Sequence, residues 1–204
     1  MELEWERVAA AFRARVSARV SGVSLKRAAV AVVLREGATG LEILFIRRAE
    51  HPHDPWSGQM AFPGGRFEPG DADLVATAVR ETHEEIGLDL AAVGDCLGAL
   101  DELRAMARMQ PMNLAIAPFV FRLRQDAPLR LSDEVTSAHW LPLEELFSAR
   151  FRSLHEHDHG GARLQSPCIL YEGLVIWGLT YRMFAALQEV LAGEAAAADS
   201  AGGA

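Results

Sequence analysis

Three carboxylates that a helix would bring together stand near the middle of the chain, at Glu81, Glu84 and Glu85. At about 100° per residue, Glu81 and Glu85 lie one turn apart and Glu84 lies close to both. Like charges at this spacing repel each other, so the cluster is mildly unfavourable on its own. A divalent cation would reverse that, because hard cations such as Mg²⁺ bind carboxylate oxygens and usually arrive together with substrate phosphates. The spacing therefore predicts a metal site on a helix.

A glycine-rich turn, at Gly64 and Gly65, comes shortly before these carboxylates in the stretch FPGGRFEPGDADLVATAVRETHEEIGL, residues 62–88. Glycine lets the backbone approach a phosphate closely, because it has no side chain. Arg80 can reach Glu84 one helical turn away. The face expected to pack on a sheet is formed by Leu74, Val75, Ala78, Val79, Thr82 and Ile86. We therefore expect the carboxylates at the rim of a cleft beside that face.

The elements around this helix mix strands and helices without a regular alternation, which favours an α+β or layered mixed-sheet domain. The expected elements are an amphipathic helix (3–20), a hairpin (28–34 and 41–46), a loop (49–58), strands at 112–124 (with Pro118 at an edge or bulge) and 135–141, a short helix (143–149), a hairpin around 172–173 and a closing helix (177–191). We predict an N-terminal helix in 1–22, the main domain in 23–192 and a disordered tail in 193–204. The N-terminal helix would pack on the domain or on the second subunit of a homodimer.

The composition narrows the classes of partner. The chain has 204 residues, about half of them hydrophobic, and a formal net charge of −8. That charge argues against a broad nucleic-acid surface, although metal ions can still bring phosphates to an acidic protein. Its two cysteines, Cys96 and Cys168, form no CxxC pair and predict buried free thiols in a reducing cytoplasm. We also expect no signal peptide and no membrane span.

Other residues that could do chemistry are less informative. His51 and His53 lie in the predicted loop, while His155, His157 and His159 alternate along the chain. A zinc site at the alternating histidines is an alternative, but no clear fourth ligand stands nearby, so solvated loop side chains are the favoured interpretation. The sequence has no GxSxG motif and neither cysteine has a nucleophile's context, so covalent catalysis has little support.

The glycine turn and the carboxylates together resemble the box of the Nudix hydrolases, G-x5-E-x7-R-E-U-x-E-E-x-G-U, where U is a bulky aliphatic residue. The second half matches at Arg80, Glu81, Glu84, Glu85, Gly87 and Leu88. Thr82 replaces an aliphatic residue, and the acidic position falls at Asp71, with eight residues instead of seven between it and Arg80. Asp73 competes with Asp71 for that role. A one-residue insertion here is expected for Nudix proteins that resemble coenzyme A pyrophosphatases.

Stretches outside the box resemble the same subfamily. Arg48 and Ala49 fit one step of its upstream motif, and residues 58–65 fit the end of that motif. Asp54 stands where the motif has an arginine. Residues 132–143 are similar to a later strand of the family, and residues 176–180 to the start of its last helix.

The resemblance implies an α/β/α sandwich with a central mixed sheet, and metal-dependent hydrolysis of a pyrophosphate bond in a nucleoside diphosphate derivative. Among the substrates that the resemblance implies, a coenzyme A-like molecule is the first choice. The alternatives are ADP-ribose, a nucleotide sugar or a nucleoside triphosphate, a ligand-binding module without activity, or a structural helix with a solvated acidic face. The ion would be Mg²⁺ or Mn²⁺, and the partner a small-molecule diphosphate, with no nucleic acid and no membrane involved.

The resemblance also assigns roles to residues. Glu81, Glu84 and Glu85 would bind the metal, with the Gly64 carbonyl as a further ligand, and Arg80 would orient the carboxylates. Gly64, Gly65, Arg47 and Arg48 would lie against the substrate, although strand-end surface charge explains the two arginines equally well. The general base stays open among the three glutamates, Glu102 and Glu134.

Overall fold

The computed structural model describes residues 3–22, 24–52, 54, 56–107, 110–159 and 162–201, with the side chains of 107, 159, 162 and 194–201 outside the description. His53 and the side chain of His159 therefore lie outside the described residues. The helices are α1 (Trp5–Arg13), α2 (Leu74–Ile86), α3 (Leu90–Val93), α4 (Leu143–Phe147) and α5 (Gly178–Ala201), with a 3-10 turn η1 (Ala149–Phe151). The strands are β1 (Lys26–Gly37), β2 (Gly40–Arg48), β3 (Met60–Ala61), β4 (Gly64–Arg66), β5 (Gly94–Ala99), β6 (Leu103–Ala107), β7 (Gln110–Leu123), β8 (Val135–Pro142), β9 (Arg152–His159), β10 (Ala162–Tyr171) and β11 (Leu174–Trp177).

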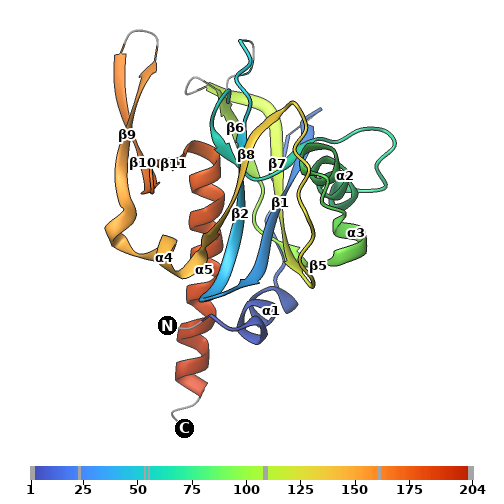
Figure 1. The fold of residues 1–204 in the computed structure, drawn as a ribbon, viewed down its shortest axis with the longest axis vertical. Helices are drawn as coiled ribbons and strands as arrows, with labels where there is room; N and C mark the ends of the chain where they lie inside the picture. Colours follow the sequence, from blue (N-terminus) through green and yellow to red (C-terminus); the bar gives the residue numbers. More distant parts are fainter. Residues whose placement is uncertain are drawn as a thin grey trace.

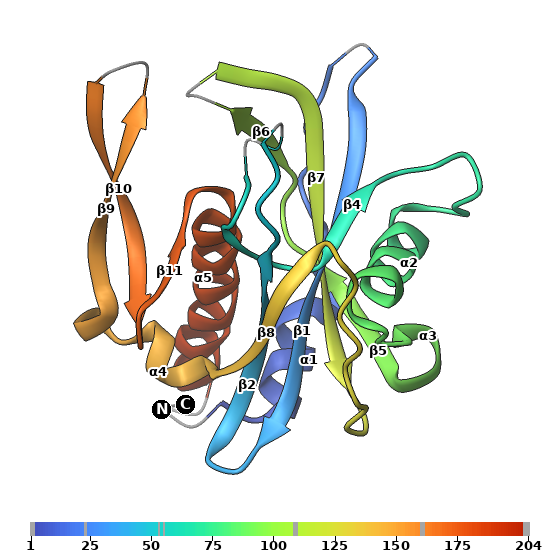
Figure 2. The same ribbon diagram turned by 45° about the horizontal axis from the view of Figure 1, so that its top comes forward.

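A mixed sheet forms the centre of the molecule. In the described part of the chain it contains eight strands, with the path β3-β2-β1-β7-β5 and with β4, β6 and β8 pairing with β1, β7 and β2. The pair β1 and β7 is parallel, and the hairpin of β1 and β2 is antiparallel, as the sequence predicts. A smaller antiparallel sheet, β11-β10-β9, packs against α5, and its strand β11 also contacts β3 at the edge of the main sheet (Figures 1 and 2).

Helices cover both faces of the main sheet, and β1 shows how the sequence achieves this. Its side chains alternate between two cores: Val30 and Val32 belong to the core with α1 and α5, while Ala31 and Val33 belong to the core with α2 and α3. All are almost fully buried, as expected for a continuous apolar run in the middle of a covered sheet. Figure 2 shows α2 and α3 on one side of the sheet and α5 on the other. The predicted α/β/α architecture is confirmed.

The N-terminal helix is shorter than predicted. Helix α1 ends at Arg13, whereas the apolar spacing predicts a helix from 3 to 20. The segment after it leaves the helix because the turn at Asp101 binds it: the Asp101 carboxylate accepts from Arg15 Nη2 (2.6 Å) and from the Ala18 amide (2.9 Å). These tertiary bonds replace the helical ones of the last turns. The helix itself packs on α5 and β5, so the expected packing on the domain is confirmed.

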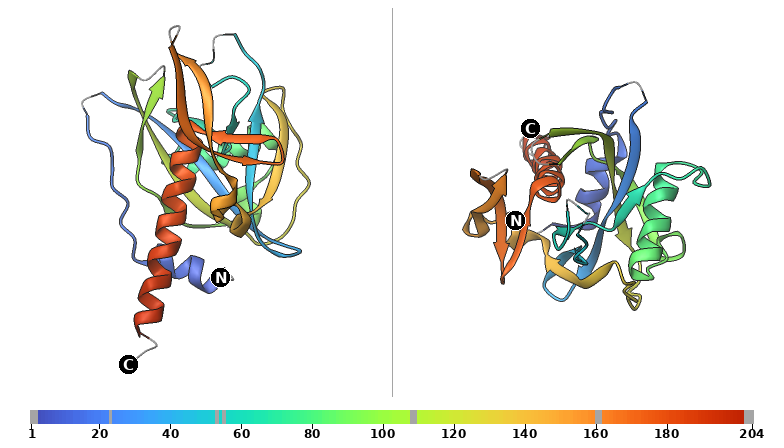
Figure 3. Two further views of the ribbon diagram at one scale, coloured as in Figure 1. Left: turned by 90° about the vertical axis from the view of Figure 1, so that its left-hand side faces the viewer. Right: turned by 90° about the horizontal axis from the view of Figure 1, so that it is seen from above.

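At the other end, α5 runs to Ala201, into the segment predicted to be a disordered tail (Figure 3). The segment GEAAAADSA is rich in alanine, the residue with the highest helix propensity, so it continues the helix that precedes it.

No helix in the described ranges is both long and apolar enough to cross a membrane.

Of the edge or bulge expected at Pro118, the edge is wrong, but the pairing of β7 with β5 and with β6 does shift register, as at a β-bulge. Strand β7 lies between β1 on one side and β5 and β6 on the other. Pro118 faces the interruption between β5 and β6, where its carbonyl accepts from the Leu100 amide (2.9 Å). A residue without an N–H is tolerated inside this sheet because the neighbouring strand is broken beside it.

The alternating histidines lie on a strand, so the predicted loop there is wrong. His155 and His157 share one face of β9 and both contact the Trp177 ring, at centroid distances of 4.6 and 4.7 Å. Their described contacts are therefore aromatic packing between β9 and β11. The two cysteines are free, as predicted, but only Cys168 is buried and Cys96 is exposed.

Candidate active site

A cavity of about 620 Å³ opens beside α2 and β4, where the sequence predicts the cleft. Its acidic side chains are Asp54, Glu68, Glu81, Glu84, Glu85 and Glu134, and its arginines are Arg48, Arg66 and Arg80. The large apolar and sulfur-containing side chains in its lining are Trp56, Met60, Phe62, Met112, Leu114, Ile116, Leu179 and Met183. One cavity therefore joins a cluster of carboxylates to an apolar wall.

Helix α2 is held at both ends by its own sequence. At its N-terminus the Asp73 carboxylate accepts from the Ala76 amide (2.8 Å), which makes Asp73 the helix cap. At its C-terminus Gly87 adopts a left-handed conformation (φ 69°), the expected glycine cap. Between these caps, Ala78 and Ile86 are fully buried against the sheet. Glu81 and Glu84 therefore face the cavity from a helix whose position is fixed.

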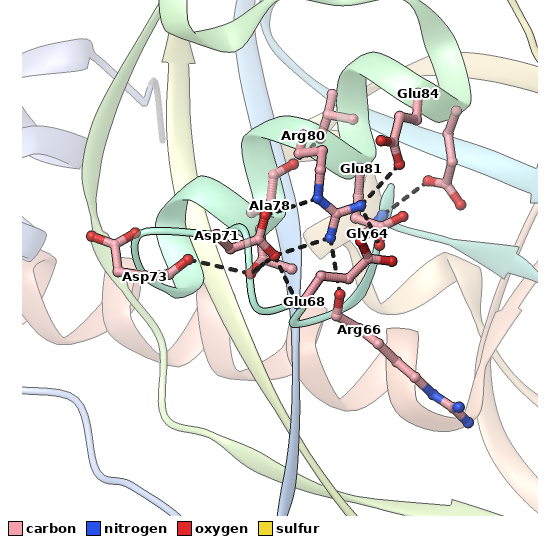
Figure 4. A network of polar contacts seen from close by, with 12 residues as sticks. Gly64, Arg66, Glu68, Asp71, Asp73, Ala78, Arg80, Glu81 and Glu84 are labelled. Carbon is pink, nitrogen blue, oxygen red and sulfur yellow. Dashed lines mark hydrogen bonds and ion pairs between the residues drawn. The ribbon is translucent and has the colours of Figure 1, made fainter.

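Arg80 organises the carboxylates around it (Figure 4). Its guanidinium donates to Asp71 (2.8 and 3.0 Å), to Glu81 (3.0 Å) and to Glu84 (2.9 Å), and also to the carbonyl of Arg66 (3.0 Å). These charge-assisted bonds hold the pKa of the Asp71 carboxyl well below its usual range and raise the pKa of Arg80. Asp71, and not Asp73, therefore makes the ion pair with Arg80 that the spacing left undecided.

Glu85 lies deepest of the three glutamates, with a side chain only 4% exposed. Its Oε2 accepts from the Gly64 amide (2.9 Å), and its Oε1 lies 3.7 Å from Arg48 Nη1. Burial raises the pKa of Glu85 to about 7. The Gly64 amide and Arg48 act in the opposite direction and lower it, while the charges of Glu81 and Glu134 raise it further. Burial also raises the pKa of Glu81. Two of the three carboxylates therefore carry a charge that this protein environment disfavours.

Both glycines of the turn are required by close contacts. Gly64 has φ 153°, and a Cβ there would lie 2.3 Å from the carbonyl oxygen of Ala29. A Cβ on Gly65 would lie 2.3 Å from Glu81 Oε1. The first glycine lets β4 pair with β1, and the second leaves room for a carboxylate. Gly64 contacts the site through its amide, which donates to Glu85. That its carbonyl binds the metal stays a prediction.

Only one of the two predicted arginines reaches the cavity. Arg48 lines it, whereas Arg47 is exposed, with Nε 3.4 Å from the carbonyl of Gly58, and is absent from the lining. Neighbouring residues of a strand point to opposite faces. In addition, the pairing of β2 with β8 shifts register between Arg47 and Arg48, the kind of irregularity that re-aims a side chain. The structure therefore leaves Arg48 as the candidate for substrate contact.

Of the two later acidic residues proposed as general bases, Glu102 and Glu134, only one reaches the cavity. Glu134 lines the cavity. Glu102 lies elsewhere: it forms an ion pair with Arg27 and accepts from the Val20 amide (2.8 Å) beneath the N-terminal segment. Glu102 is therefore a structural residue, and Glu134 is the later acidic residue that the fold brings to the site.

Sequence reasoning missed the apolar wall. Met60 comes from β3, Met112 and Leu114 from β7, and Met183 from α5, and most of these side chains are nearly buried. No local spacing links them, because each follows the periodicity of its own element. Their convergence depends on the tertiary arrangement, in which the start of α5 binds β3 through Thr180 Oγ1 and the Met60 carbonyl (3.0 Å).

The donor set fits a hard cation. In the described part of the chain no three His, Cys, Asp or Glu side chains already converge as a metal-binding group, and Arg80 donates to both Glu81 and Glu84. Yet Glu81, Glu84 and Glu85 share one cavity, all their donors are carboxylate oxygens, and two have raised pKa values that a cation would lower. These three residues are the ones that would hold Mg²⁺ or Mn²⁺.

The raised pKa of Glu85 predicts how stability depends on pH in the metal-free protein. Between its ordinary value of 4.5 and about 7, the folded state keeps a proton that the unfolded chain loses. The free energy of unfolding should therefore fall as pH rises through this window, by at most about 3 kcal/mol. Urea unfolding in EDTA at pH 5 and pH 8 measures this. Glu85→Gln should show a smaller fall, because Glu85 no longer titrates while Glu81 still does, and equal pH dependence in the two proteins would contradict the assignment.

Comparisons with known proteins agree with the fold and the box. The family model described as NUDIX domain matches residues 25–162, more than half of the chain. The chain is 35% identical over 140 residues to an uncharacterised Nudix hydrolase, NudL, of Yersinia pestis (strain Pestoides F), a match that covers 68% of this chain. It covers 66% of that relative, just under two thirds of the relative's length.

Two solved structures show the same fold. A MutT/nudix family protein from Enterococcus faecalis has a TM-score of 0.54 at 16% identity, and the match covers 93% of this chain and 70% of that one. A MutT protein from Methanosarcina mazei Go1 has a TM-score of 0.50 at 19% identity, covering 87% and 96%. With the family model matched over the sheet and the box helix α2, the chain belongs to the Nudix family.

Proposed function

We propose that this protein hydrolyses the pyrophosphate bond of a nucleoside diphosphate derivative with the help of Mg²⁺ or Mn²⁺. The observation that carries the proposal is the cavity in which Glu81, Glu84 and Glu85 lie beside the Gly64–Gly65 turn. A ligand-binding module or a solvated helix would have no need for two desolvated carboxylates with raised pKa values. A cytoplasmic location, in keeping with the two free thiols, belongs to the same proposal.

Each residue of the site has a role in this reaction. A bound divalent cation would neutralise the diphosphate and lower the pKa of a bound water. Glu81, Glu84 and Glu85 would hold the cation, and Arg80 keeps Glu81 and Glu84 on one side of the helix. A carboxylate that faces the cavity accepts the proton of the attacking water; the three glutamates and Glu134 are the candidates.

The apolar wall favours a coenzyme A-like substrate. A diphosphate bound at the carboxylates would direct the rest of the molecule along Met60, Met112 and Met183. Methionine side chains adapt to flexible, unbranched groups such as a pantetheine arm. A sugar would bring several hydroxyl groups that a wall of this composition leaves without hydrogen bonds. ADP-ribose, nucleotide sugars and nucleoside triphosphates are therefore the second choice.

The test is a panel of these compounds, each incubated with Mg²⁺, with Mn²⁺ and with EDTA, and products identified by mass spectrometry. We expect metal-dependent cleavage, fastest for coenzyme A or a derivative of it. Cleavage of a nucleotide sugar alone would retain the reaction and overturn the substrate. Binding of a compound from the panel without cleavage would favour the ligand-binding module.

Replacing Glu84 by glutamine should lower turnover by at least about two orders of magnitude, because one charged oxygen ligand is lost. The side chain is half exposed and its described bond is to Arg80, so the fold should be unaffected. Steady-state kinetics with Mn²⁺ measure this. Glu189→Gln, an exposed glutamate on α5 away from the cavity, is the matched control. Full activity of Glu84→Gln would remove Glu84 from the metal site.

A further inference from the structure

An aspartate that the proposed chemistry does not use lies in the same cavity. Asp54 Oδ2 accepts from Arg48 Nε (3.0 Å) and Nη2 (2.8 Å), and the Asp54 side chain is only 16% exposed. The third nitrogen of that guanidinium, Nη1, lies 3.7 Å from Glu85 Oε1. Asp54 is thus joined through one arginine to the deepest carboxylate of the site.

The backbone fixes Asp54 independently of Arg48. Its Oδ1 accepts from the Trp56 amide (3.0 Å), its own amide donates to the His51 carbonyl (3.1 Å), and its carbonyl accepts from the Ser57 amide (3.1 Å). This is the arrangement in which an aspartate side chain closes a turn on its own backbone. The Asp54 carboxylate is therefore held in place by bonds that do not involve Arg48.

Arg48 lies at different distances from the carboxylates of Asp54 and Glu85. A guanidinium that binds a carboxylate directly has N–O distances of about 2.7–2.9 Å. Arg48 meets that range with Asp54 but stays outside it with Glu85. Glu85 Oε2 is already used by the Gly64 amide, so Oε1 is the oxygen that faces Arg48 and the cavity. If Arg48 moved closer by about 1 Å, it would occupy Oε1.

We propose, on the basis of the proposed function, that Asp54 is a positioning residue that holds Arg48 away from Glu85 and so keeps Glu85 Oε1 available to a divalent cation. Without the charge of Asp54, the half-buried guanidinium would turn to the nearest remaining carboxylate, which is Glu85. A cation would then have to displace an ion pair on a carboxylate that is only 4% exposed, and buried ion pairs are stronger than exposed ones.

Asp54→Asn tests this role, because the amide keeps an oxygen for the Trp56 N–H but loses both the charge and the second oxygen, which accepts from Arg48. Mn²⁺ binding, measured by electron paramagnetic resonance without substrate, should be about tenfold weaker than in the wild type, at the lower end of the range for lost outer-sphere partners. Asp126→Asn is the matched control, since Asp126 forms an exposed ion pair with Arg35. That variant should bind Mn²⁺ as the wild type does.

Removing the arginine tests the route of the effect. Arg48→Gln should bind Mn²⁺ at least as tightly as the wild type, and Asp54→Asn should have no further effect in that background. A general disturbance of the loop would weaken binding in both backgrounds. Thermal melts of all variants check that each one folds.

The possible outcomes separate this inference from the proposed function. Wild-type Mn²⁺ affinity in Asp54→Asn, or a persistent loss in the double variant, overturns the positioning role and leaves the metal site intact. A wild-type protein that binds no Mn²⁺, or Glu85→Gln with unchanged Mn²⁺ binding, overturns the metal site and with it the role of Asp54. Weaker binding in Asp54→Asn that Arg48→Gln restores supports the inference.

Discussion

Glu85→Gln should lower hydrolysis by about three orders of magnitude and, at pH 8, make the metal-free protein more stable. The two effects have one cause. The buried carboxylate is unfavourable in the metal-free fold, where its pKa is about 7, and it is the deepest of the proposed metal ligands. About 4 kcal/mol of lost charge stabilisation corresponds to the loss of rate. Steady-state kinetics with Mn²⁺ and urea unfolding in EDTA measure the two effects.

The opposite signs make this prediction specific. A variant that had simply misfolded would lose both activity and stability. The glutamine keeps an oxygen that can accept from the Gly64 amide, so β4 should stay in place. A less active but also less stable variant at pH 8 would contradict the view that this carboxylate is retained for the metal.

Gly65→Ala should lower turnover by about 100-fold without unfolding the protein. The added Cβ would lie 2.3 Å from Glu81 Oε1, at the end of a flexible side chain, so the carboxylate moves and the backbone need not. A shift of about 1 Å in a catalytic group can cost that much. Kinetics, with a thermal melt on the same sample, measure the effect.

Gly64→Ala is the comparison that separates position from fold. Its Cβ would meet the Ala29 carbonyl and the Val30 Cα, both backbone atoms of a central strand, and φ is strongly positive. We therefore expect a loss of about 2 kcal/mol or more in stability. If Gly65→Ala were fully active, the placement of Glu81 against this turn would be wrong. If it melted as early as Gly64→Ala, its loss of activity would say nothing about Glu81.

Local sequence was sufficient to place the acidic half of the site. The three glutamates, Arg80 and the cap at Gly87 all lie within one helix, and a helix has a fixed period, so their relative positions follow from counting. The ion pair of Arg80 with Glu84 was predictable in the same way. The partner of Arg80 could not be predicted in this way. Asp73 caps the helix and Asp71 pairs with Arg80, and counting along the sequence does not decide between the two.

The rest of the site depends on contacts between distant elements. Arg47 and Arg48 are neighbours in sequence, and only the folded structure, in which the pairing with β8 shifts register between them, shows that Arg48 lines the cavity. The apolar wall combines β3, β7 and α5. The length of α1 likewise depends on bonds from Arg15 and Ala18 to Asp101, which lies 86 and 83 residues away in the sequence. The periodicity of a single segment does not predict such bonds. Such competition between local propensity and tertiary bonds is where single-sequence reasoning fails.

The most direct test of the central claim is incubation of the wild-type protein with coenzyme A and Mn²⁺, followed by mass spectrometry. If the acidic cavity hydrolyses the diphosphate, the products should be 4′-phosphopantetheine and adenosine 3′,5′-bisphosphate. They should be absent with EDTA and strongly reduced in Glu85→Gln. Intact coenzyme A and intact diphosphates across the rest of the panel, with either metal and with correctly folded protein, would contradict the account.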